Sequence, residues 1–433
     1  MLRGLNWLVK YLFSLLRVFS ILVIALFLPR LYLWHTELPQ DIVTHSQSDK
    51  FKLGIENLSD NLFKWFKAGQ KEAKLAIGLI TNQTGTDQEG NYNIDILAQN
   101  GLTVKKILMP QGSDYKNELA QSNRQMPKIP IIVSGAKGNY DLFSKKVLRD
   151  INVLMFDMQD SGVRYYGYVS MLLKAMQAAG VYNKKFVVLD RPNLLGWCME
   201  GSSMSDAQLS SQSSVPLRHG MTIGELATYF NKHVLEKPID LHVVPMEHYD
   251  RQNQARKPLA CGLSRNINTI DSCYGYSFLG LLGEVAPFEI GIGTDKAFQC
   301  LLLPEHLKFP KQKWQELRLL LDDQGIESKP YRYYSSRKKE YCSGLRLYIH
   351  DINHFSSFKT LLSVLNFFNQ SGLKLTFSKQ FDASLGNDKV RSLLQGKVLP
   401  AQLAVQVNDD LQNFFKKAFN CFLYKPFPKI LQV

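Results

Sequence analysis

The chain has few cysteines and lacks the short motifs that mark the commonest cofactor sites. Its six cysteines include no Cys-x-x-Cys pair, which argues against a structural zinc site. No G-x-G-x-x-G opens the first predicted helix, and no G-x-x-x-x-G-K-[ST] or G-x-S-x-G sequence occurs. These absences argue against NAD, ATP and serine-hydrolase chemistry. We therefore expect no cofactor and no metal, and we interpret the cysteines as buried free thiols.

Acidic residues are scarcer than basic ones across the 433 residues. The 52 lysines and arginines outnumber the 38 acidic residues, which gives a net charge of +14. A basic surface suits anionic partners such as phospholipid headgroups or an acidic cell-wall polymer. Nucleic acid is not expected, because the chain has no zinc-finger spacing, no aromatic RNP-like strand and no concentrated basic helix. The 45% hydrophobic and 21% charged content is typical of a globular protein.

The amino terminus contains the one long apolar run. Residues 18–28 are uninterrupted by charge, and residues 11–16 extend the run if Arg17 lies near the membrane interface. Arg3, Lys10 and Arg17 favour a cytoplasmic amino terminus, and no small-x-small cleavage site follows Leu28. We expect residues 1–40 to hold an uncleaved single-pass anchor in a bacterial inner membrane, with the bulk of the chain in the periplasm. A cleaved signal peptide is the alternative.

Short apolar runs then alternate with helical stretches, which predicts an α/β fold with a parallel sheet. Residues 71–245 are expected to form a Rossmann-like domain, and residues 255–433 a smaller carboxy-terminal α/β domain. The expected strands are 74–80, 103–109, 129–133, 152–157, 185–190 and 239–245, and the expected helices are 93–100, 141–149, 169–180 and 222–235. Residues 35–70 are interpreted as a polar linker with an amphipathic piece at 58–66, and residues 246–258 as the link to the second domain.

Each of four strands ends in a cluster of polar residues. In open α/β sheets ligands bind beyond the carboxyl ends of the strands, so this pattern predicts a polar-ligand site. The candidate residues are Asn82, Gln111, Asp157, Gln159, Asp160, Arg164, Tyr166, Asp190, Arg191, Asn193, Glu200, Arg218, His219 and Glu225.

Part of this set has a structural interpretation as well. Thr222 and Glu225 have the spacing of a helix capping box. Asp157 and Asp190 end buried strands, where an unpaired carboxylate is costly, so we expect them to pair with Arg164 or Arg191. The glycine-rich stretch 291–295 is predicted to be a tight turn that presents Thr294 and Asp295.

Several of these blocks resemble one known family. The stretch Asp157-Met-Gln-Asp-Ser-Gly-Val-Arg-Tyr-Tyr-Gly-Tyr168 is similar to a signature of the exo-β-N-acetylmuramidase (NamZ-like) family, formerly a domain of unknown function. The blocks 189–193, 200–201 and 218–227 resemble it too. Shorter similarities lie at 81–85, 264–267, 291–295 and 381–386, so the resemblance runs from about residue 74 to Tyr424.

The resemblance implies two α/β domains with a substrate cleft between them. It also implies removal of terminal N-acetylmuramic acid from peptidoglycan fragments or muropeptides. Such an enzyme needs a carboxyl group near the glycosidic oxygen. The lactyl carboxylate of the sugar would be bound by an arginine, which Arg164, Arg191 or Arg218 could supply.

One departure from the family pattern concerns the second strand. The family typically ends that strand in Pro-Glu-His-Gly, whose Glu is the favoured catalytic carboxylate. Here the matching stretch is Pro110-Gln111-Gly112, so Gln111 replaces the Glu and the His is missing. A glutamine amide cannot transfer a proton at a useful pKa. Pro304-Glu-His-Leu307 has a similar sequence, but its place in the chain indicates a chance match.

Three hypotheses follow from these observations. The first is an active glycosidase that uses another carboxylate, such as Asp160, Asp114 or Glu284. The second is a non-catalytic binder of muropeptides, which needs arginine and aromatic contacts but no carboxylate in the cleft. The third is a basic membrane scaffold with no small ligand.

Overall fold

The computed structural model describes residues 50–67, 75–113, 129–135, 141–203, 215–254 and 262–433. Residues Lys50–Val433 form one compact unit. The predicted membrane segment at residues 11–28 lies outside the described residues. Within the described ranges, no helix is both long enough and apolar enough to cross a bilayer.

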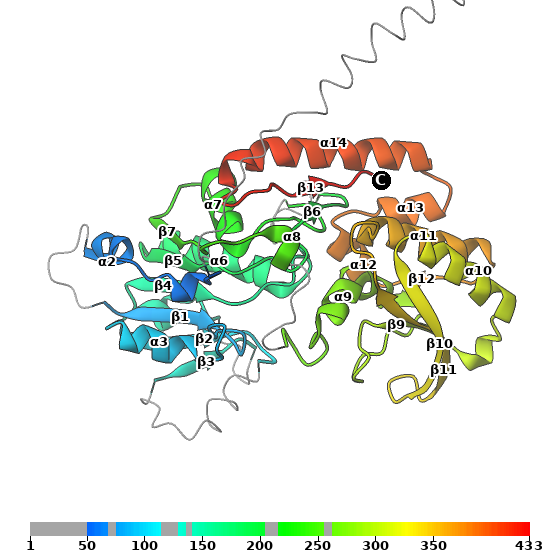
Figure 1. Cartoon of the computed structure of the whole chain (residues 1–433), viewed down its shortest axis with the longest axis horizontal. Helices are drawn as coiled ribbons and strands as arrows, with labels where there is room; N and C mark the ends of the chain where they lie inside the picture. The colour runs from blue at the N-terminus through cyan, green and yellow to red at the C-terminus, as the bar shows by residue number, and fades with distance from the viewer. Residues whose placement is uncertain (1–49, 68–74, 114–128, 136–140, 204–214, 255–261) are drawn as a thin grey trace, which may run out of the picture. The chain divides into compact units, whose positions relative to one another are not determined.

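Six parallel strands form the central sheet of this unit. They are β1 (Ile77–Thr81), β2 (Val104–Met109), β3 (Ile131–Val133), β4 (Val153–Asp157), β5 (Lys185–Leu189) and β7 (Leu241–Val244). Their order is β3-β2-β1-β4-β5-β7, and every neighbouring pair is parallel (Figure 1). This is the doubly wound Rossmann order, and it confirms the predicted α/β fold with a parallel sheet.

Burial on both faces explains why these strands are apolar runs rather than alternating patterns. In β4, Leu154 and Phe156 join one hydrophobic core, and Val153 and Met155 join the core on the opposite face. Parallel strands covered by helices on both faces need apolar residues at every position. The helices of this region are α2 (Asp60–Lys67), α3 (Asn93–Gln99), α5 (Lys145–Leu148), α6 (Gly167–Val181), α7 (Ile223–His233) and α8 (Arg251–Gln254).

The carboxy-terminal half contains a second, antiparallel sheet of order β10-β11-β9. Its strands are β9 (Cys300–Pro304), β10 (Ile326–Ser335) and β11 (Glu340–Ile349), with short strands β8 (Val285–Ala286) and β12 (Thr376–Phe377) nearby in sequence. The helices are α9 (Ile270–Leu282), α10 (Lys311–Asp322), α11 (Ser357–Gln370), α12 (Lys379–Leu385), α13 (Lys389–Leu394) and α14 (Pro400–Ala418).

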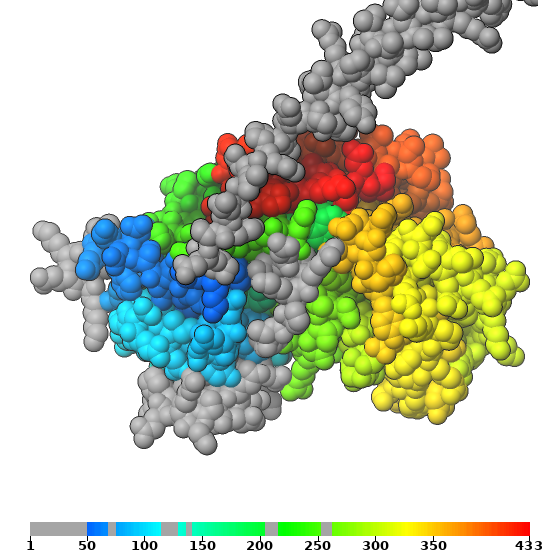
Figure 2. Space-filling model, viewed as in Figure 1, coloured from blue at the N-terminus to red at the C-terminus, as the bar shows by residue number. Residues whose placement is uncertain are grey.

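Two short strands, β6 (Cys198–Met199) and β13 (Lys429–Ile430), pair the end of the chain with its middle. The 3-10 turns are η1 (Gly54–Glu56), η3 (Glu305–Leu307) and η4 (Phe419–Cys421). Figure 2 shows α14 and the chain after it as an orange and red band across one face.

Segments that the sequence suggested were linkers contribute to the packed core. Leu53 and Leu62 are buried in the same cluster as β1, because α2 is amphipathic and lies against the sheet. Downstream of β7, Tyr249 and Arg251 are also buried. Cys198, Cys273, Cys300, Cys342 and Cys421 are buried free thiols, as expected, and Cys261 lies outside the described residues.

Candidate functional site

The polar ends of the parallel strands meet at one edge of the sheet. Thr81 of β1 pairs in register with Asp157 of β4, and Phe156 of β4 pairs with Val188 of β5. Asn82, Asp157 and Asp190 therefore lie at the same edge, as predicted. After β1 the chain continues to β2 on one side of the sheet, and after β4 it continues to β5 on the other side. The loops after β1 and β4 therefore flank the switch point, where sheets of this kind bind ligands.

Asp157 is fully buried and both of its oxygens are bound. Arg191 Nε donates to Oδ1 at 2.6 Å, and Asn93 Nδ2 donates to Oδ2 at 2.7 Å. Arg191 also donates from Nη2 to the Thr86 carbonyl at 2.9 Å. The predicted pairing of Asp157 with an arginine is confirmed. This pair ties the loops after β1, β4 and β5 together.

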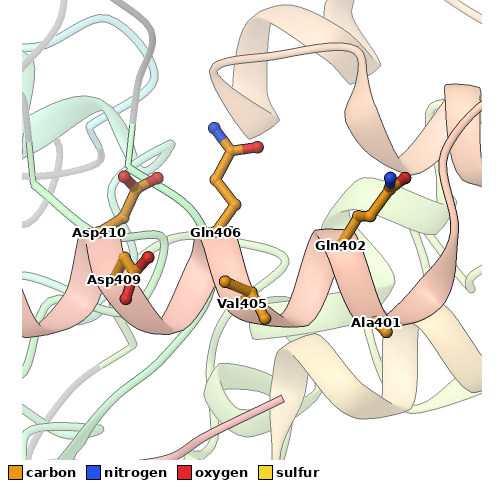
Figure 3. A pocket seen from close by; sticks show the side chains of 6 residues that line it. All are labelled: Ala401, Gln402, Val405, Gln406, Asp409 and Asp410. Carbon is orange, nitrogen blue, oxygen red and sulfur yellow. The ribbon is translucent and has the colours of Figure 1, made fainter.

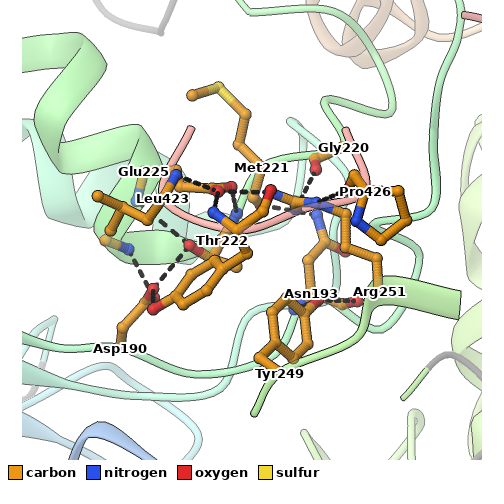
Figure 4. A network of polar contacts seen from close by, with 12 residues as sticks. Asp190, Asn193, Gly220, Met221, Thr222, Glu225, Tyr249, Arg251, Leu423 and Pro426 are labelled. Carbon is orange, nitrogen blue, oxygen red and sulfur yellow. Dashed lines mark hydrogen bonds and ion pairs between the residues drawn. The ribbon is translucent and has the colours of Figure 1, made fainter. Parts of the chain in front are cut away.

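Asp190 lies at the centre of a second buried network, shown in Figure 4. Its Oδ1 accepts from the backbone N–H groups of Arg191 and Gly224, at 2.9 and 2.8 Å. Its Oδ2 accepts from the hydroxyls of Thr222 and Tyr424, at 2.8 and 2.7 Å. Burial raises the pKa of Asp190 to about 6 even though these bonds favour the charged form. These four donors are two hydroxyls and two backbone N–H groups, one of them at the start of α7, whereas the sequence predicted an arginine side chain.

Glu225 closes the capping box that the sequence predicted for α7. Its Oε2 accepts from the Thr222 backbone N–H at 2.9 Å, and the Glu225 N–H donates to Thr222 Oγ1 at 3.2 Å. Its Oε1 binds Arg251 Nη2 and the Leu423 N–H (Figure 4). Glu225 thus joins α7, α8 and the end of the chain.

Arg164 and Arg218 are fully buried, and their guanidinium groups donate hydrogen bonds to other residues of the protein. The two Nη atoms of Arg164 donate to four carbonyls, two of them (Ser384 and Leu385) at the end of α12. Burial lowers the pKa of Arg164 to about 9. Arg218 Nη1 donates to Glu200 Oε1 at 2.8 Å, and Glu200 in turn accepts the backbone N–H groups that begin α11. Both arginines fasten the first half of the chain to the second.

Asp160 and His219 form a buried pair with unused hydrogen-bonding capacity. Asp160 Oδ2 accepts the Gly162 N–H at 2.7 Å and lies 3.4 Å from His219 Nε2. The Met221 N–H donates to His219 Nδ1 at 3.2 Å, which places the proton of a neutral ring on Nε2. In the part of the chain that the structure describes, Asp160 Oδ1 and His219 Nε2 have no hydrogen-bond partner. Buried polar atoms without partners are unusual in a protein interior.

Tyrosines surround this pair and connect it to the loop after β1. The Tyr166 ring packs against Tyr168 and Tyr276, with ring centroids 4.7 and 5.8 Å apart. Burial raises the pKa of Tyr166 and of Tyr276, and the charge of Asp160 raises both further. Tyr168 accepts a hydrogen bond from Asn82 Nδ2. Aromatic faces beside a carboxyl group and amides are a common lining for a sugar site.

Gln111 lies in the loop after β2, at the same edge of the sheet. It is exposed directly after β2, and its side chain lies over the backbone of Gly135. Ser113 Oγ donates to Gln83 Oε1 at 3.0 Å, and Gln83 Nε2 donates to the Leu263 carbonyl at 2.8 Å. Tyr166 binds that same carbonyl at 3.2 Å. A continuous set of contacts therefore joins the Gln111 loop to the tyrosines around Asp160.

Gln159 and Asn193 hold the loops in place. Gln159 donates its backbone N–H to Thr84 Oγ1 at 2.8 Å and its side-chain amide to the Asp160 carbonyl at 2.9 Å. Asn193 Nδ2 donates to the Met221 carbonyl at 2.7 Å, and its Oδ1 accepts the Leu195 N–H. These amides shape the edge through backbone contacts.

The remaining predicted residues lie in the carboxy-terminal half. Glu284 follows α9 and accepts from Ser378 Oγ at 2.6 Å. Thr294 closes the predicted tight turn by donating to the Gly291 carbonyl at 2.8 Å, and exposed Asp295 pairs with Lys296. The Glu-His pair of η3 lies on the antiparallel sheet, where Glu305 binds Arg332, in agreement with a chance match. Asp114 lies outside the described residues.

A pocket on the surface of α14 contains none of the predicted site residues. Its lining is Ala401, Gln402, Val405, Gln406, Asp409 and Asp410 (Figure 3). All six belong to one helix, so this pocket is separate from the polar edge of the parallel sheet. Among the described residues there is no group of three or more side chains suited to hold a metal ion.

Two family models match most of the chain. The model described as exo-β-N-acetylmuramidase NamZ, N-terminal, matches residues 77–270, and its C-terminal counterpart matches residues 274–424. The chain belongs to the NamZ exo-β-N-acetylmuramidase family. The polar residues at the edge of the parallel sheet fall within the amino-terminal family match. Glu284 and Thr294 fall within the carboxy-terminal family match.

Relatives of the NamZ family support this assignment. The peptidoglycan β-N-acetylmuramidase NamZ of Bacillus subtilis is 28% identical over 406 residues, which cover 88% of this chain and 92% of the relative. A DUF1343 family protein of Bacteroides fragilis, solved by crystallography, is 27% identical with a TM-score of 0.73. A second one is 22% identical with a TM-score of 0.66 and shows the shared fold. Each alignment covers 88% of this chain and 100% of the solved chain.

The structure adds site neighbours that the sequence did not single out. Gln83, Leu263 and Tyr276 connect the Gln111 loop to Asp160, and Tyr276 comes from α9. The short similarity at 264–267 was the available signal for this loop. No local pattern pointed to Tyr276, because its ring reaches the site only through the packing of α9 on the first half.

Proposed function

We propose that this protein binds the terminal N-acetylmuramic acid of peptidoglycan fragments at the polar edge of the parallel sheet and hydrolyses the glycosidic bond very slowly. The observation that carries this proposal is Gln111, exposed at the end of β2 where the family pattern has its Glu. General acid–base catalysis typically contributes ~10²–10⁴-fold in rate. An amide forfeits that contribution but still hydrogen-bonds a sugar.

Family membership supports a peptidoglycan-derived ligand. The Bacillus subtilis relative is named as a peptidoglycan β-N-acetylmuramidase, and it aligns with nearly the whole folded region. The local chemistry agrees, because Tyr166 and Tyr168 place partly exposed aromatic groups beside the switch point, where the fully buried Asn82 holds Tyr168 in position.

The lactyl carboxylate of the sugar requires a cation at the surface. Arg164, Arg191 and Arg218 are 1%, 4% and 0% exposed, so a ligand at the surface does not reach them. Arg265 is exposed on the loop whose Leu263 carbonyl binds both Gln83 and Tyr166. We therefore assign the recognition of the lactyl carboxylate to Arg265.

An active glycosidase that uses Asp160 is the second candidate. It is favoured by the free Oδ1 of Asp160 and by His219 at 3.4 Å, which together could hold and release a proton. Asp160 is 3% exposed, so a substrate would reach it after the tyrosine cluster moved. The binder hypothesis needs no such movement.

Turnover and binding measured on the same preparation test the proposal. Wild-type protein should bind N-acetylmuramic acid in calorimetry and should hydrolyse a chromogenic N-acetylmuramic acid β-glycoside far more slowly than an ordinary glycosidase. Ordinary turnover that disappears in Asp160→Asn would establish the second candidate. Absence of both binding and turnover would favour the scaffold hypothesis.

We also propose that residues 11–28 anchor the chain in a bacterial inner membrane, with residues 50–433 in the periplasm. The uninterrupted apolar run and its basic flank support this location. Alkaline extraction of membranes should leave the protein in the pellet. Mature protein that begins beyond residue 28 and is fully soluble on fractionation would refute the anchor.

A further inference from the structure

The last part of the chain combines phenylalanines and lysines without any acidic residue. Residues 411–433 contain five phenylalanines, four lysines and no aspartate or glutamate. They form the end of α14, the turn η4 and strand β13. The segment therefore offers apolar rings and positive charge together.

Four aromatic rings from this segment form a closed cluster. Phe415 contacts Phe419 and Phe422, with centroids 5.9 and 5.7 Å apart. Phe427 contacts the same two rings at 5.2 and 5.6 Å. The cluster reaches the surface, because Phe419 is 46% exposed and the adjacent Leu423 is 45% exposed. We call these five residues and the surrounding lysines the Phe–Lys patch.

The lysines of the patch are all exposed. Lys416 and Lys417 lie on the last turn of α14, and Lys425 and Lys429 lie on the returning chain. An apolar cluster bordered by lysines matches an anionic membrane surface, where rings enter the acyl boundary and ammonium groups meet phosphate. A glycan would need hydrogen-bonding groups in the centre of the patch, where the exposed side chains are Phe and Leu.

The chain enters the compact unit beside this patch. The Phe51 ring lies 6.4 Å from Tyr249, and Tyr249 lies 5.0 Å from Tyr424, which follows Leu423 in sequence. Phe51 packs on the cluster of Met246, Tyr249 and Tyr424. A segment attached to a membrane would join the folded unit here, at the side that carries the patch.

From these observations we infer that the Phe–Lys patch binds an anionic phospholipid surface and holds the folded unit against the membrane. This inference does not rest on the proposed glycan function. In Figure 1 the elements that carry the patch, α14 and β13, lie at the top, while β2, which Gln111 follows, lies toward the bottom. The patch would operate whether or not residues 1–49 span a bilayer.

Vesicle flotation of residues 50–433 tests the inference. This compact unit contains both regions matched by the family models, residues 77–270 and 274–424, so it is expected to fold without residues 1–49. It should float with vesicles of phosphatidylcholine mixed with phosphatidylglycerol, not with phosphatidylcholine alone, and high salt should release it. A Phe419→Trp variant should show a blue-shifted emission with the mixed vesicles.

Charge-reversal variants give the matched comparison. Lys416→Glu with Lys417→Glu should lower the vesicle partition coefficient roughly thirtyfold or more, because each basic residue near an anionic surface contributes about fivefold. Lys145→Glu with Lys146→Glu, an exposed lysine pair on α5, should leave partitioning unchanged. Circular dichroism and thermal melting of each variant check folding.

Three outcomes of the vesicle and lysine experiments would overturn the inference. They are no flotation with the mixed vesicles, an equal loss in both lysine-pair variants, and patch-dependent binding to isolated peptidoglycan in place of vesicles. Insertion of the rings is tested separately, since Phe419→Ser should weaken flotation severalfold. Flotation unaffected by Phe419→Ser would show that charge alone holds the protein, contrary to the inference.

Discussion

His219 Nε2 lies 3.4 Å from Asp160 Oδ2 in the interior of the protein, and within the described ranges His219 Nε2 and Asp160 Oδ1 have no hydrogen-bond partner. The two buried carboxylates at the ends of β4 and β5 are instead committed to the fold, since Asp157 binds Arg191 and Asn93, and Asp190 accepts four hydrogen bonds. Of these three buried carboxylates, Asp160 is therefore the candidate for proton transfer, and position 111 is tested beside it.

Restoring the missing carboxylate should increase turnover. We expect Gln111→Glu to hydrolyse the chromogenic N-acetylmuramic acid β-glycoside ~10²-fold faster than wild type, at the lower end of the range for acid–base catalysis because the family His is also missing. Gln111→Ala is the control, and it should remain as slow as wild type. A wild-type rate equal to that of Gln111→Glu would show that position 111 does not limit the chemistry.

Arg265 should determine recognition of the lactyl group. We expect Arg265→Gln to weaken N-acetylmuramic acid binding roughly tenfold or more, because hydrogen bonds to charged groups contribute about 1.5–3 kcal/mol. Binding of N-acetylglucosamine, which has no lactyl carboxylate, should stay unchanged in calorimetry. Arg149→Gln, at an exposed position after α5, serves as the control. Equal losses for both sugars would contradict the assignment.

Asp190 should make stability depend on pH in the acid range. Its folded pKa of about 6 exceeds that of a free aspartate, so the native state binds the proton more tightly than the unfolded state does. The stability contributed by protonated Asp190 is full below about pH 4 and is lost as the pH rises to about 6. In Asp190→Asn this decline should disappear from the free energy of unfolding measured in urea.

Asn is a suitable replacement at position 190. Its oxygen can accept the two backbone N–H groups, while its amide can donate to the hydroxyls of Thr222 and Tyr424. The variant should therefore fold. An unchanged decline in Asp190→Asn would assign the pH dependence to another group.

Arg164 should contribute strongly to stability. Arg164→Met removes the guanidinium donor from four buried carbonyls, of which Leu385 keeps a hydrogen bond from Ser202 Oγ, and each unmet buried group costs about 1–3 kcal/mol. For the other three carbonyls we expect a loss of at least ~3 kcal/mol in the free energy of unfolding by urea. Arg318→Met, at an exposed position of α10, should change stability by less than ~1 kcal/mol. Similar urea midpoints of unfolding for both variants would contradict the stabilising role of Arg164.

The sequence by itself determined the order of strands and helices and the place of the site. Apolar runs with β-branched residues mark β1, β4 and β5, because strands covered on both faces must be apolar throughout. The capping box of Thr222 and Glu225 was also readable, since it spans four consecutive residues. The substitution at Gln111 is visible in the sequence because it interrupts a local motif.

The tertiary structure alone decided what each polar residue touches. Arg164 Nη2 donates to the Leu385 carbonyl, which is 221 residues away in the sequence. Asp190 accepts a hydrogen bond from the Tyr424 hydroxyl, which is 234 residues away. Such partners depend on how the two halves pack, which no local pattern specifies. The same packing removed Arg164, Arg191 and Arg218 from the surface and left Asp160 facing His219. Local periodicity therefore fixes where a polar cluster lies, while burial and long-range contacts decide which of its members can meet a ligand.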